Sequence, residues 1–354
     1  FAPQLKHFTE VAAPAEVLKS SYSNQEDKPI DVEPPLTALT PLTVRMRRHA
    51  GLYKNKARAP ELKNVLLLTA SNFGYLEMLT NWECFAKRLG LDWMVMAMDS
   101  ELEAHLGERG FLASGPQRKE AASFRAAAFN VVGCNKLRSV LDVLRKTHLD
   151  VVFSDADNVF KSDPFLPSLS LGSMIRSGRY EYIYGRDIAP PAVPGDRIQN
   201  LNPAVYHQEP GFANTGFYYV AGGRKQSVVH QIFKTSLEWC ANRPELDDQD
   251  NFWGSLVVTR SKKSTEKGYL CFRHCESGSC MGVNESIVLN YCDMSPWEYI
   301  LGSVSPESAL EEPRMATYHA THVVGWQEKK EKLRTVGLWA DCNESEVTGQ
   351  PRLP

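Results

Sequence analysis

The sequence predicts an α/β fold with a mostly parallel central sheet flanked by helices. Apolar runs and amphipathic segments alternate from Asn64 onward in the order strand, helix, strand, helix, strand, over about 90 residues. Strands separated by helices need crossover connections, which join parallel neighbours. In addition, 43% of the 354 residues are apolar, which is sufficient for a large buried core. The order of elements indicates a Rossmann-like sheet, whose ligands bind at the carboxyl ends of the strands.

The individual elements follow from their apolar patterns. The first strand is expected at 64–70 ("NVLLLTA"), a helix at 73–90, a second strand at 91–99 ("LDWMVMAMD"), a long or broken helix at 119–146 and a third strand at 149–157 ("LDVVFSDAD"). Shorter elements are expected beyond Asp163: strands at 180–185 and 215–222, helices at 227–241 and 247–257, a late strand at 315–325 and a helix at 326–339. The predicted core domain therefore spans 61–340.

The two ends of the chain differ from this pattern. Residues 1–60 hold seven of the 21 prolines and show little apolar periodicity, which is typical of a stem or of an arm that wraps a domain. Residues 341–354 form a short C-terminal tail. Because the sequence begins with Phe1 instead of Met, we expect a processed or truncated chain from which a targeting or anchoring segment has been removed.

Charge and hydropathy exclude two classes of partner. The formal net charge is -2, with 40 basic and 42 acidic residues and no long basic cluster, so no nucleic acid partner is expected. The longest apolar stretches are far shorter than the roughly 20 residues that cross a bilayer. Membrane attachment is therefore expected only through an N-terminal anchor absent from this chain.

The cysteines indicate an oxidising compartment. There are eight, at positions 84, 134, 240, 271, 275, 280, 292 and 342, and four of them fall within 271–292. Two N-glycosylation sequons, at Asn284 and Asn343, lie in or near this half of the chain. Together these features favour disulfides and a Golgi or ER lumenal location, as in a type II membrane protein without its anchor. A zinc site from Cys271, His274, Cys275 and Cys280 is the alternative, although its spacing lacks paired Cys-x-x-Cys knuckles.

The most informative chemical motif is "VVFSDADNVF", an apolar strand that ends in Asp155 and Asp157. Residues i and i+2 of an extended strand point to the same side, so both carboxylates are expected to face one divalent cation. Oxygen ligands suit Mn²⁺ or Mg²⁺. A cation at this place would stabilise the charge of a departing diphosphate.

Three further roles for this Asp pair fit the residues less well. A calcium loop starting at Asp155 would need Gly and Glu where Phe160 and Leu166 stand. A haloacid-dehalogenase-like phosphohydrolase would use Asp155, but its motif normally opens the domain, whereas two strand–helix units precede it here. The two Asp residues could also merely cap the next segment.

Five segments together resemble a known family. They are "LLLTASNFGYLEMLTNW", "DVVFSDADNVFKSDPF", "ANTGFYYV", "DDQDNFW" and "HATHVVGWQEKKEKLRTVGLW", in this order over about residues 62–339. The combination resembles the nucleotide-diphospho-sugar transferases of glycosyltransferase family 77, the plant and algal arabinosyl-, xylosyl- and galactosyltransferases. The resemblance implies a GT-A fold, a divalent cation, and transfer with retention of anomeric configuration.

The resemblance also assigns roles to residues. It implies that Asp155, Asp157 and a late histidine bind the metal; His319 fits the family pattern better, and His322 is the alternative because it fits a His-x-x-Gly form. Nucleotide contacts are implied for a strand-end loop, for the metal motif and for two lysines, namely Thr69, Ala70, Ser71, Asn72, Asp155, Ala156, Lys136 and Lys329. Ordinary structural roles also fit these residues, such as an N-cap at Ser71 or Asn72 and solvated lysines.

The donor sugar is expected to contact Asn214, Thr215 and Gly216, where glycine lets the backbone approach closely. Asp248 and Gln249 match the catalytic Asp-Gln pair, with Asp248 as nucleophile or charge stabiliser and Asp247 as the alternative if the register slips by one. The competing interpretation is an acidic cluster that only complements a helix dipole.

The sequence thus predicts a metal-dependent retaining glycosyltransferase that uses a UDP-sugar and acts on a glycan or glycoprotein. Arabinofuranose or xylose is favoured over galactose, and a cell-wall glycan is the expected kind of product. The non-enzymatic alternative is an inactive glycan-binding scaffold, which intact metal ligands disfavour. Trp253, Trp297 and Trp326 are candidates for a sugar-stacking platform, although large aromatics are more often core.

Overall fold

The computed structural model describes residues 40–117, 127–187, 213–222, 228–261, 271–276, 288–340 and 342. Apart from Thr40, these residues belong to one compact unit, Pro41–Pro354. Expectations for residues 1–39, for the tail 343–354 and for both sequons lie outside the described residues. No helix in the described ranges is both long and apolar enough to cross a bilayer.

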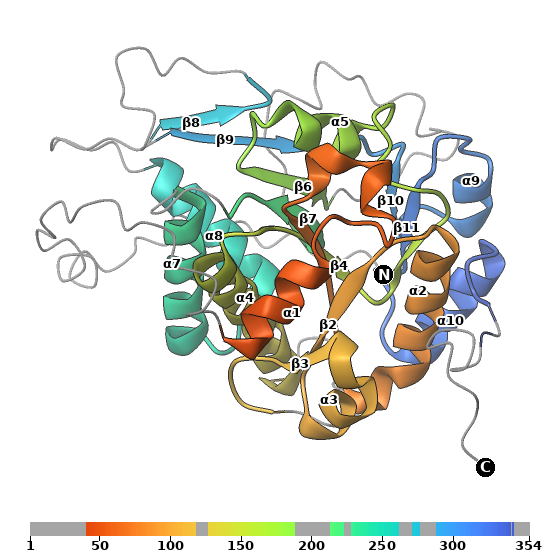
Figure 1. Ribbon diagram of the computed structural model, residues 1–354, viewed down its shortest axis with the longest axis horizontal. Helices are drawn as coiled ribbons and strands as arrows, with labels where there is room; N and C mark the ends of the chain where they lie inside the picture. Colours follow the sequence, from red (N-terminus) through yellow and green to blue (C-terminus); the bar gives the residue numbers. More distant parts are fainter. Residues whose placement is uncertain are drawn as a thin grey trace, which may run out of the picture. The chain divides into compact units, whose positions relative to one another are not determined.

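An eight-stranded sheet forms the centre of this unit (Figure 1). Its strands, in spatial order, are β3 (Gly110–Leu112), β2 (Trp93–Ala97), β1 (Val65–Ser71), β4 (Asp150–Asp155), β7 (Ala213–Val220), β6 (Tyr182–Arg186), β9 (Val288–Asp293) and β8 (Cys271–His274). Each pair is parallel except that β7 runs antiparallel to both β4 and β6. The chain passes from β1 to β2 on one side and places β4 on the other, so the strand order reverses at β1, where α/β sheets bind ligands.

A small second sheet has the order β10 (Tyr299–Leu301), β11 (Thr317–His319) and β5 (Asn158–Phe160). Strand β5 follows β4 after two turn residues, and it pairs antiparallel with β11 so that His319 lies opposite Asn158. The late strand expected at 315–325 is therefore only three residues long. It ends because the chain turns after His319, with His322 at a positive φ of 58°.

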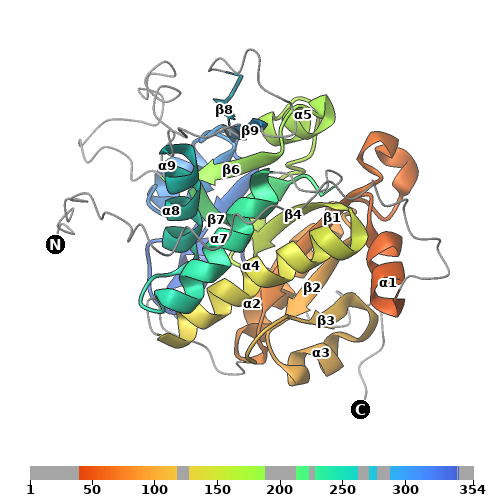
Figure 2. The ribbon, with the colours of Figure 1, turned by 90° about the vertical axis from the view of Figure 1, so that its left-hand side faces the viewer.

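Helices cover both faces of the large sheet (Figures 1 and 2). They are α1 (Pro41–His49), α2 (Leu76–Arg88), α3 (Ser100–Leu106), α4 (Ala127–Thr147), α5 (Ser170–Ser177), α7 (Val228–Asn242), α8 (Asp248–Ser261), α9 (Pro306–Leu310) and α10 (Trp326–Thr335). Strand β1 is buried on both faces, so Leu67 packs into the core beside α2 and α10 whereas Leu66 and Leu68 pack into the core beside α4, α7 and α8. This double burial accounts for its continuous apolar run.

The segment 41–62 contributes to both cores. Met46 of α1 packs with the α4 side, whereas Leu52, Tyr53 and Leu62 are buried on the α2 side. Tyr53 also donates a hydrogen bond to Asp163 at 2.8 Å. These residues fall within the region where the sequence predicts a stem or arm, and this part of it packs on the domain.

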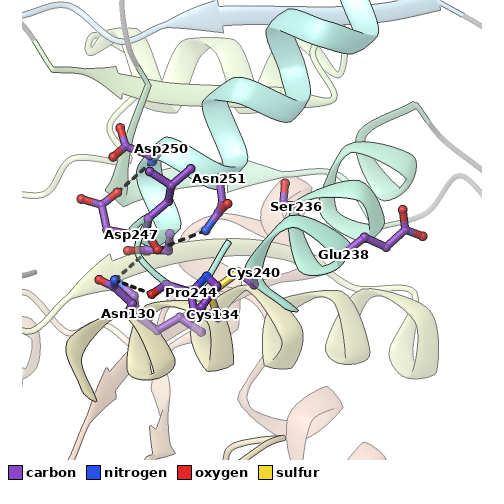
Figure 3. Close-up of a disulfide and its surroundings, with 12 residues drawn as sticks. Asn130, Cys134, Ser236, Glu238, Cys240, Pro244, Asp247, Asp250 and Asn251 are labelled. Atoms are coloured by element: carbon purple, nitrogen blue, oxygen red, sulfur yellow. Dashed lines mark hydrogen bonds and ion pairs between the residues drawn. A yellow bond between two sulfur atoms is a disulfide. The ribbon is translucent and has the colours of Figure 1, made fainter. Parts of the chain in front are cut away.

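Among the described residues there are three disulfides, Cys84–Cys342, Cys134–Cys240 and Cys275–Cys292, which confirms the prediction of disulfides. The zinc alternative is wrong, because Cys275 is bonded to Cys292 and has no thiolate to offer. The second disulfide ties α4 to α7 (Figure 3), close to the hydrogen bond from Asn130 to the carbonyl of Pro244. It thereby fastens α4 to the segment that leads into α8.

We expect the Cys134–Cys240 bond to stabilise the protein more than the Cys275–Cys292 bond. The chain-entropy argument relates stabilisation to loop length, and the separations are 106 and 17 residues. Replacing Cys134 and Cys240 together with alanine should therefore cost about 1 to 2 kcal/mol more than the matched double replacement of Cys275 and Cys292. Urea unfolding of both variants measures the difference. Equal losses, or the reverse order, would contradict the expectation.

A buried histidine on α7 predicts acid sensitivity. Burial and the nearby positive charges of Arg145 and His148 lower the pKa of His230 from 6.5 to about 4. The folded state holds the neutral imidazole, whereas the unfolded state takes up a proton below pH 6.5. The contribution of His230 to the free energy of unfolding is therefore present above pH 6.5 and is lost as the pH falls toward 4. The free energy of unfolding should drop by about 2 kcal/mol between pH 7 and pH 5 through this group. His230→Gln, measured by urea unfolding at both pH values, should lose that part of the dependence; an unchanged slope would contradict it.

Candidate active site

Two carboxylates and one imidazole meet at the carboxyl end of β4. One ligand atom each from Asp155, Asp157 and His319 lies within 4.8 Å of the others. Asp155 ends β4, but Asp157 lies in the turn before β5, so strand alternation is not the reason that the two carboxylates meet. The pairing of β5 with β11 brings His319 alongside, with its Nε2 3.2 Å from Asp157 Oδ1. His322 instead lies 3.4 Å from Asp187 and is outside this cluster.

The two carboxylates of the cluster differ in their electrostatic surroundings. Burial raises the pKa of Asp155, and the negative charge of Asp157 adds to this, although Lys136 opposes it. Burial also disfavours the charge of Asp157, but Lys329 and His319 outweigh burial and hold the pKa of Asp157 well below its usual range. Lys329 on α10 contacts Asp157 Oδ2 at 2.6 Å. The site therefore keeps Asp157 ionised.

A second charged group links this cluster to α8. Lys136, on α4, lies 3.0 Å from Asp155 Oδ1 and 3.3 Å from Asp248 Oδ2. Burial alone would lower the pKa of Lys136, but the two carboxylates raise it above its ordinary value. Thr215 donates to Asp248 Oδ2 at 2.9 Å. Gly133 allows this approach, because a Cβ there would lie 2.5 Å from Asp248 Oδ1.

The two neighbouring aspartates at the start of α8, Asp247 and Asp248, have different contacts. Asp247 is the helix cap: its Oδ1 accepts the backbone N–H of Asp250 at 2.8 Å (Figure 3). Asp248, one residue later, points toward Lys136 and Thr215. Gln249 accepts a hydrogen bond from the side-chain amide of Asn214 at 3.2 Å and donates to Asp187 at 2.6 Å.

Strand β7 passes close to the metal-ligand cluster. Gly216 faces both His319 and Asp155, since a Cβ at this position would come within 2.2 Å of His319 Cε1 and 2.7 Å of Asp155 Oδ2. Any side chain here would displace the cluster. Asn214 and Thr215, the two residues before Gly216, join the same site through Gln249 and Asp248.

The loop expected to bind a nucleotide borders the cluster. Ala70 is in register with Asp155, whereas Thr69 lies one position deeper and is fully buried. Ser71 and Asn72 do not cap the following 3₁₀ turn η4 (Phe73–Tyr75) through their side chains. Asp99 accepts the Phe73 N–H at 2.8 Å instead. Asn72 therefore occupies the N-cap position of η4, but its side chain makes no capping hydrogen bond.

The remaining predicted residues lie elsewhere or have ordinary contacts. Ala156 is a buried turn residue between the two carboxylates. Trp253 is buried against Tyr184, Trp297 contacts the guanidinium of Arg314, and Trp326 contacts Lys330. These tryptophans do not form one stacking platform.

Sequence reasoning missed Asp187, Tyr299 and Tyr75. Asp187 directly follows β6, so the rule that ligands gather at carboxyl ends of strands could have found it. Burial raises the pKa of Tyr75, which lies near Lys329 and Asp157. Burial likewise raises the pKa of Tyr299 well above its ordinary value, and its hydroxyl contacts His319. No motif marks either tyrosine.

The cluster fits a divalent cation. Two carboxylate oxygens and one imidazole nitrogen form a donor set suited to Mn²⁺ or Mg²⁺. Gly216, which has no side chain, leaves room for these groups to approach one another. Among the described residues, the other group with metal-ligand chemistry is His274, Cys275 and Asp293, and its cysteine is in a disulfide.

A mostly parallel sheet with this cluster at the carboxyl end of a central strand agrees with the GT-A type of fold that the sequence predicts. The sequence profile of the nucleotide-diphospho-sugar transferases matches residues 91–333, and the chain belongs to this family. The prediction of a nucleotide-diphospho-sugar transferase is thereby confirmed, whereas membership of glycosyltransferase family 77 stays a prediction.

Solved structures include several similar chains. One is a glycosyltransferase involved in the glycosylation of the major capsid of PBCV-1, with 10% identity over 76% of this chain and 98% of that one, and a TM-score of 0.42. The galactosyltransferase LgtC, in complex with donor and acceptor sugar analogs, has 11% identity over 79% and 98%, and a TM-score of 0.38. GlyE of Streptococcus pneumoniae TIGR4 has 10% identity over 80% and 61%, and a TM-score of 0.41. No curated protein matches the sequence significantly.

Proposed function

We propose that the protein transfers a sugar, with retention of configuration, from a UDP-sugar to a glycan or glycoprotein acceptor. The observation that carries this proposal is the cluster of Asp155, Asp157 and His319 at the strand-order reversal of a nucleotide-diphospho-sugar transferase fold. The family membership also disfavours the phosphohydrolase alternative. The intact cluster and its two flanking lysines disfavour an inactive scaffold.

Asp155, Asp157 and His319 would hold Mn²⁺ or Mg²⁺. When bound, such a cation supplies Lewis-acid stabilisation of the diphosphate leaving group. Lys329 adds a second positive charge at the same edge, because it is half-buried beside Asp157 and α10 fixes its position. Ala70, Ser71 and Asn72 border this edge and provide small side chains and hydroxyl or amide groups for the uridine.

Asp248 is the proposed nucleophile or charge stabiliser. Retention needs either a covalent bond to a carboxylate or front-face attack within an ion pair. Lys136 and Thr215 orient the Asp248 carboxylate, and the helix cap at Asp247 fixes the start of α8. Asn214 and Gln249 lie beside it with amide groups that suit sugar hydroxyls.

The donor and the compartment are also proposals. The motif resemblance to glycosyltransferase family 77 favours arabinofuranose or xylose over galactose, and it favours a cell-wall glycan as product. The disulfides among the described residues support a Golgi or ER lumenal location. An N-terminal anchor outside this chain would attach the protein to the membrane.

A donor screen tests this function. The purified protein would be incubated with Mn²⁺, a glycan acceptor and UDP-arabinofuranose, UDP-xylose or UDP-galactose, with the GDP-, ADP- and CMP-linked sugars as controls. We expect UDP release from a pentose donor, and NMR of the glycoside product should show the donor's anomeric configuration. Release from no UDP-sugar, or a phosphorylated Asp155 trapped with a phosphate ester, would overturn the proposal.

A further inference from the structure

The hydroxyl of Tyr299 lies between the imidazole of His319 and the side-chain amide of Asn214. Its oxygen is 2.8 Å from His319 Nδ1 and 3.0 Å from Asn214 Oδ1. Both rings are almost fully buried, with 4% and 3% of Tyr299 and His319 exposed. A buried hydroxyl with one donor proton cannot donate to both neighbours, so the direction of each hydrogen bond matters.

The backbone N–H of Gly216 determines the direction of these two hydrogen bonds. The N–H of Gly216 can only donate, and it contacts Asn214 Oδ1 at 2.8 Å. The amide is therefore oriented with its oxygen toward Gly216, and the Tyr299 hydroxyl must donate to this same oxygen. The lone pair left on the hydroxyl then faces His319 Nδ1, which has to be the protonated nitrogen.

The hydrogen bonds of Gln249 support the same orientation of the Asn214 amide. Gln249 Nε2 donates to the Asp187 carboxylate at 2.6 Å, and a carboxylate only accepts. Gln249 Oε1 consequently faces Asn214 Nδ2, at 3.2 Å. Two independent anchors, the Gly216 amide and the Asp187 carboxylate, thus impose the same orientation on Asn214.

The packing holds both rings in place. Gly185 of β6 leaves room for Tyr299, because a Cβ there would lie 1.9 Å from its Cε1. Gly216 of β7 does the same for His319. The two glycines stand on neighbouring strands of the large sheet, and the two rings come from neighbouring strands of the small sheet.

We propose that Tyr299 is a positioning residue that keeps the proton of His319 on Nδ1, so that Nε2 presents its lone pair to a cation shared with Asp155 and Asp157. This inference rests on the proposed metal-dependent function. Without the hydroxyl, the proton of a neutral His319 is free to move to Nε2, where Asp157 Oδ1 at 3.2 Å would accept it. The imidazole would then no longer be available as a ligand.

Tyr299→Phe tests the proposal, with Tyr318→Phe as the matched control. Tyr318 is also buried on the small sheet, next to His319 in sequence, but its hydroxyl contacts only the Val304 carbonyl among the described residues, at 3.4 Å. Loss of a hydrogen-bond partner behind a metal ligand should weaken Mn²⁺ binding about 10- to 100-fold in Tyr299→Phe. Isothermal titration of both variants with Mn²⁺ in the presence of UDP measures this, and the control should stay within about twofold of the unsubstituted protein.

Two further readouts separate positioning from a structural role. In Tyr299→Phe the Mn²⁺ concentration for half-maximal transfer should rise, while the rate at saturating Mn²⁺ recovers to within about threefold. In the unsubstituted protein, ¹⁵N–¹H NMR of labelled histidine should show a proton on Nδ1 of the signal that His319→Gln removes. Unchanged Mn²⁺ affinity in Tyr299→Phe, or an unprotonated Nδ1, would contradict the role of Tyr299 and leave the proposed function standing. Failure of the unsubstituted protein to bind Mn²⁺ would contradict both the role of Tyr299 and the proposed function.

Discussion

Asp157→Asn is expected to lower kcat/KM for sugar transfer by about 1,000-fold or more, which corresponds to the loss of several kcal/mol of leaving-group stabilisation. The substitution keeps the size of the side chain but removes the charge that faces Lys329 at 2.6 Å and His319 at 3.2 Å. The neutral amide oxygen is a weaker ligand for a hard divalent cation than the carboxylate that it replaces. UDP release from the donor, measured at several Mn²⁺ concentrations, gives the effect.

A nearby buried carboxylate provides the control for this variant. Asp163 follows β5, is 5% exposed, and accepts hydrogen bonds from Tyr53 and Arg58. Asp163→Asn should therefore lower the melting temperature and leave kcat/KM within about threefold. Equal activity in Asp157→Asn and the unsubstituted protein would remove the metal role from Asp157.

Asp248→Asn is expected to reduce kcat by about 1,000- to 10,000-fold, because a catalytic carboxylate would be replaced by a neutral group of the same shape. Asp248 lies outside the cluster that would hold the cation, so the affinity for UDP with Mn²⁺ should change by less than about threefold. Single-turnover kinetics and a UDP titration separate the two effects. This pattern differs from that of Asp157→Asn, which should lose UDP affinity together with turnover.

The same substitution at Asp247 shows which of the two neighbouring aspartates has the catalytic role. Asparagine is an effective N-cap, so Asp247→Asn should preserve the start of α8 and its hydrogen bond to Asp250. We expect a loss of less than about tenfold in kcat. A larger loss at Asp247 than at Asp248 would shift the catalytic role by one residue, which is the register alternative that the sequence leaves open.

Much of the fold follows from local patterns. Strand β1 and helix α2 lie where apolar runs and helical spacing predict them, because a doubly buried strand needs apolar residues on both faces. Short strands such as β5 and β10 have three residues each, and their burial depends on partners far away in the sequence. No local periodicity exists over three residues, so such strands are not predictable from the sequence.

Some residues of the candidate site were likewise predictable from the sequence, and others were not. Asp155, Asp157 and Asp248 stand in motifs with recognisable spacing, and the structure places them together. The choice between His319 and His322 depends on the register of β11 against β5 and on the turn that follows, neither of which is visible in "YHATHVVG". Tyr299 belongs to the site only because β10 pairs with β11. A resemblance can assign roles to motif residues, but hydrogen-bond partners from other elements require the structure.

Binding of UDP through a divalent cation held by Asp155, Asp157 and His319 is the step on which the proposed function depends. A calorimetric titration of the purified protein with UDP, once with Mn²⁺ and once with EDTA, measures this step directly. We predict binding that is at least about 100-fold tighter with Mn²⁺ and that Asp157→Asn abolishes. Equal UDP affinity in Mn²⁺ and in EDTA, or no binding in either, would contradict the proposed role of the cluster.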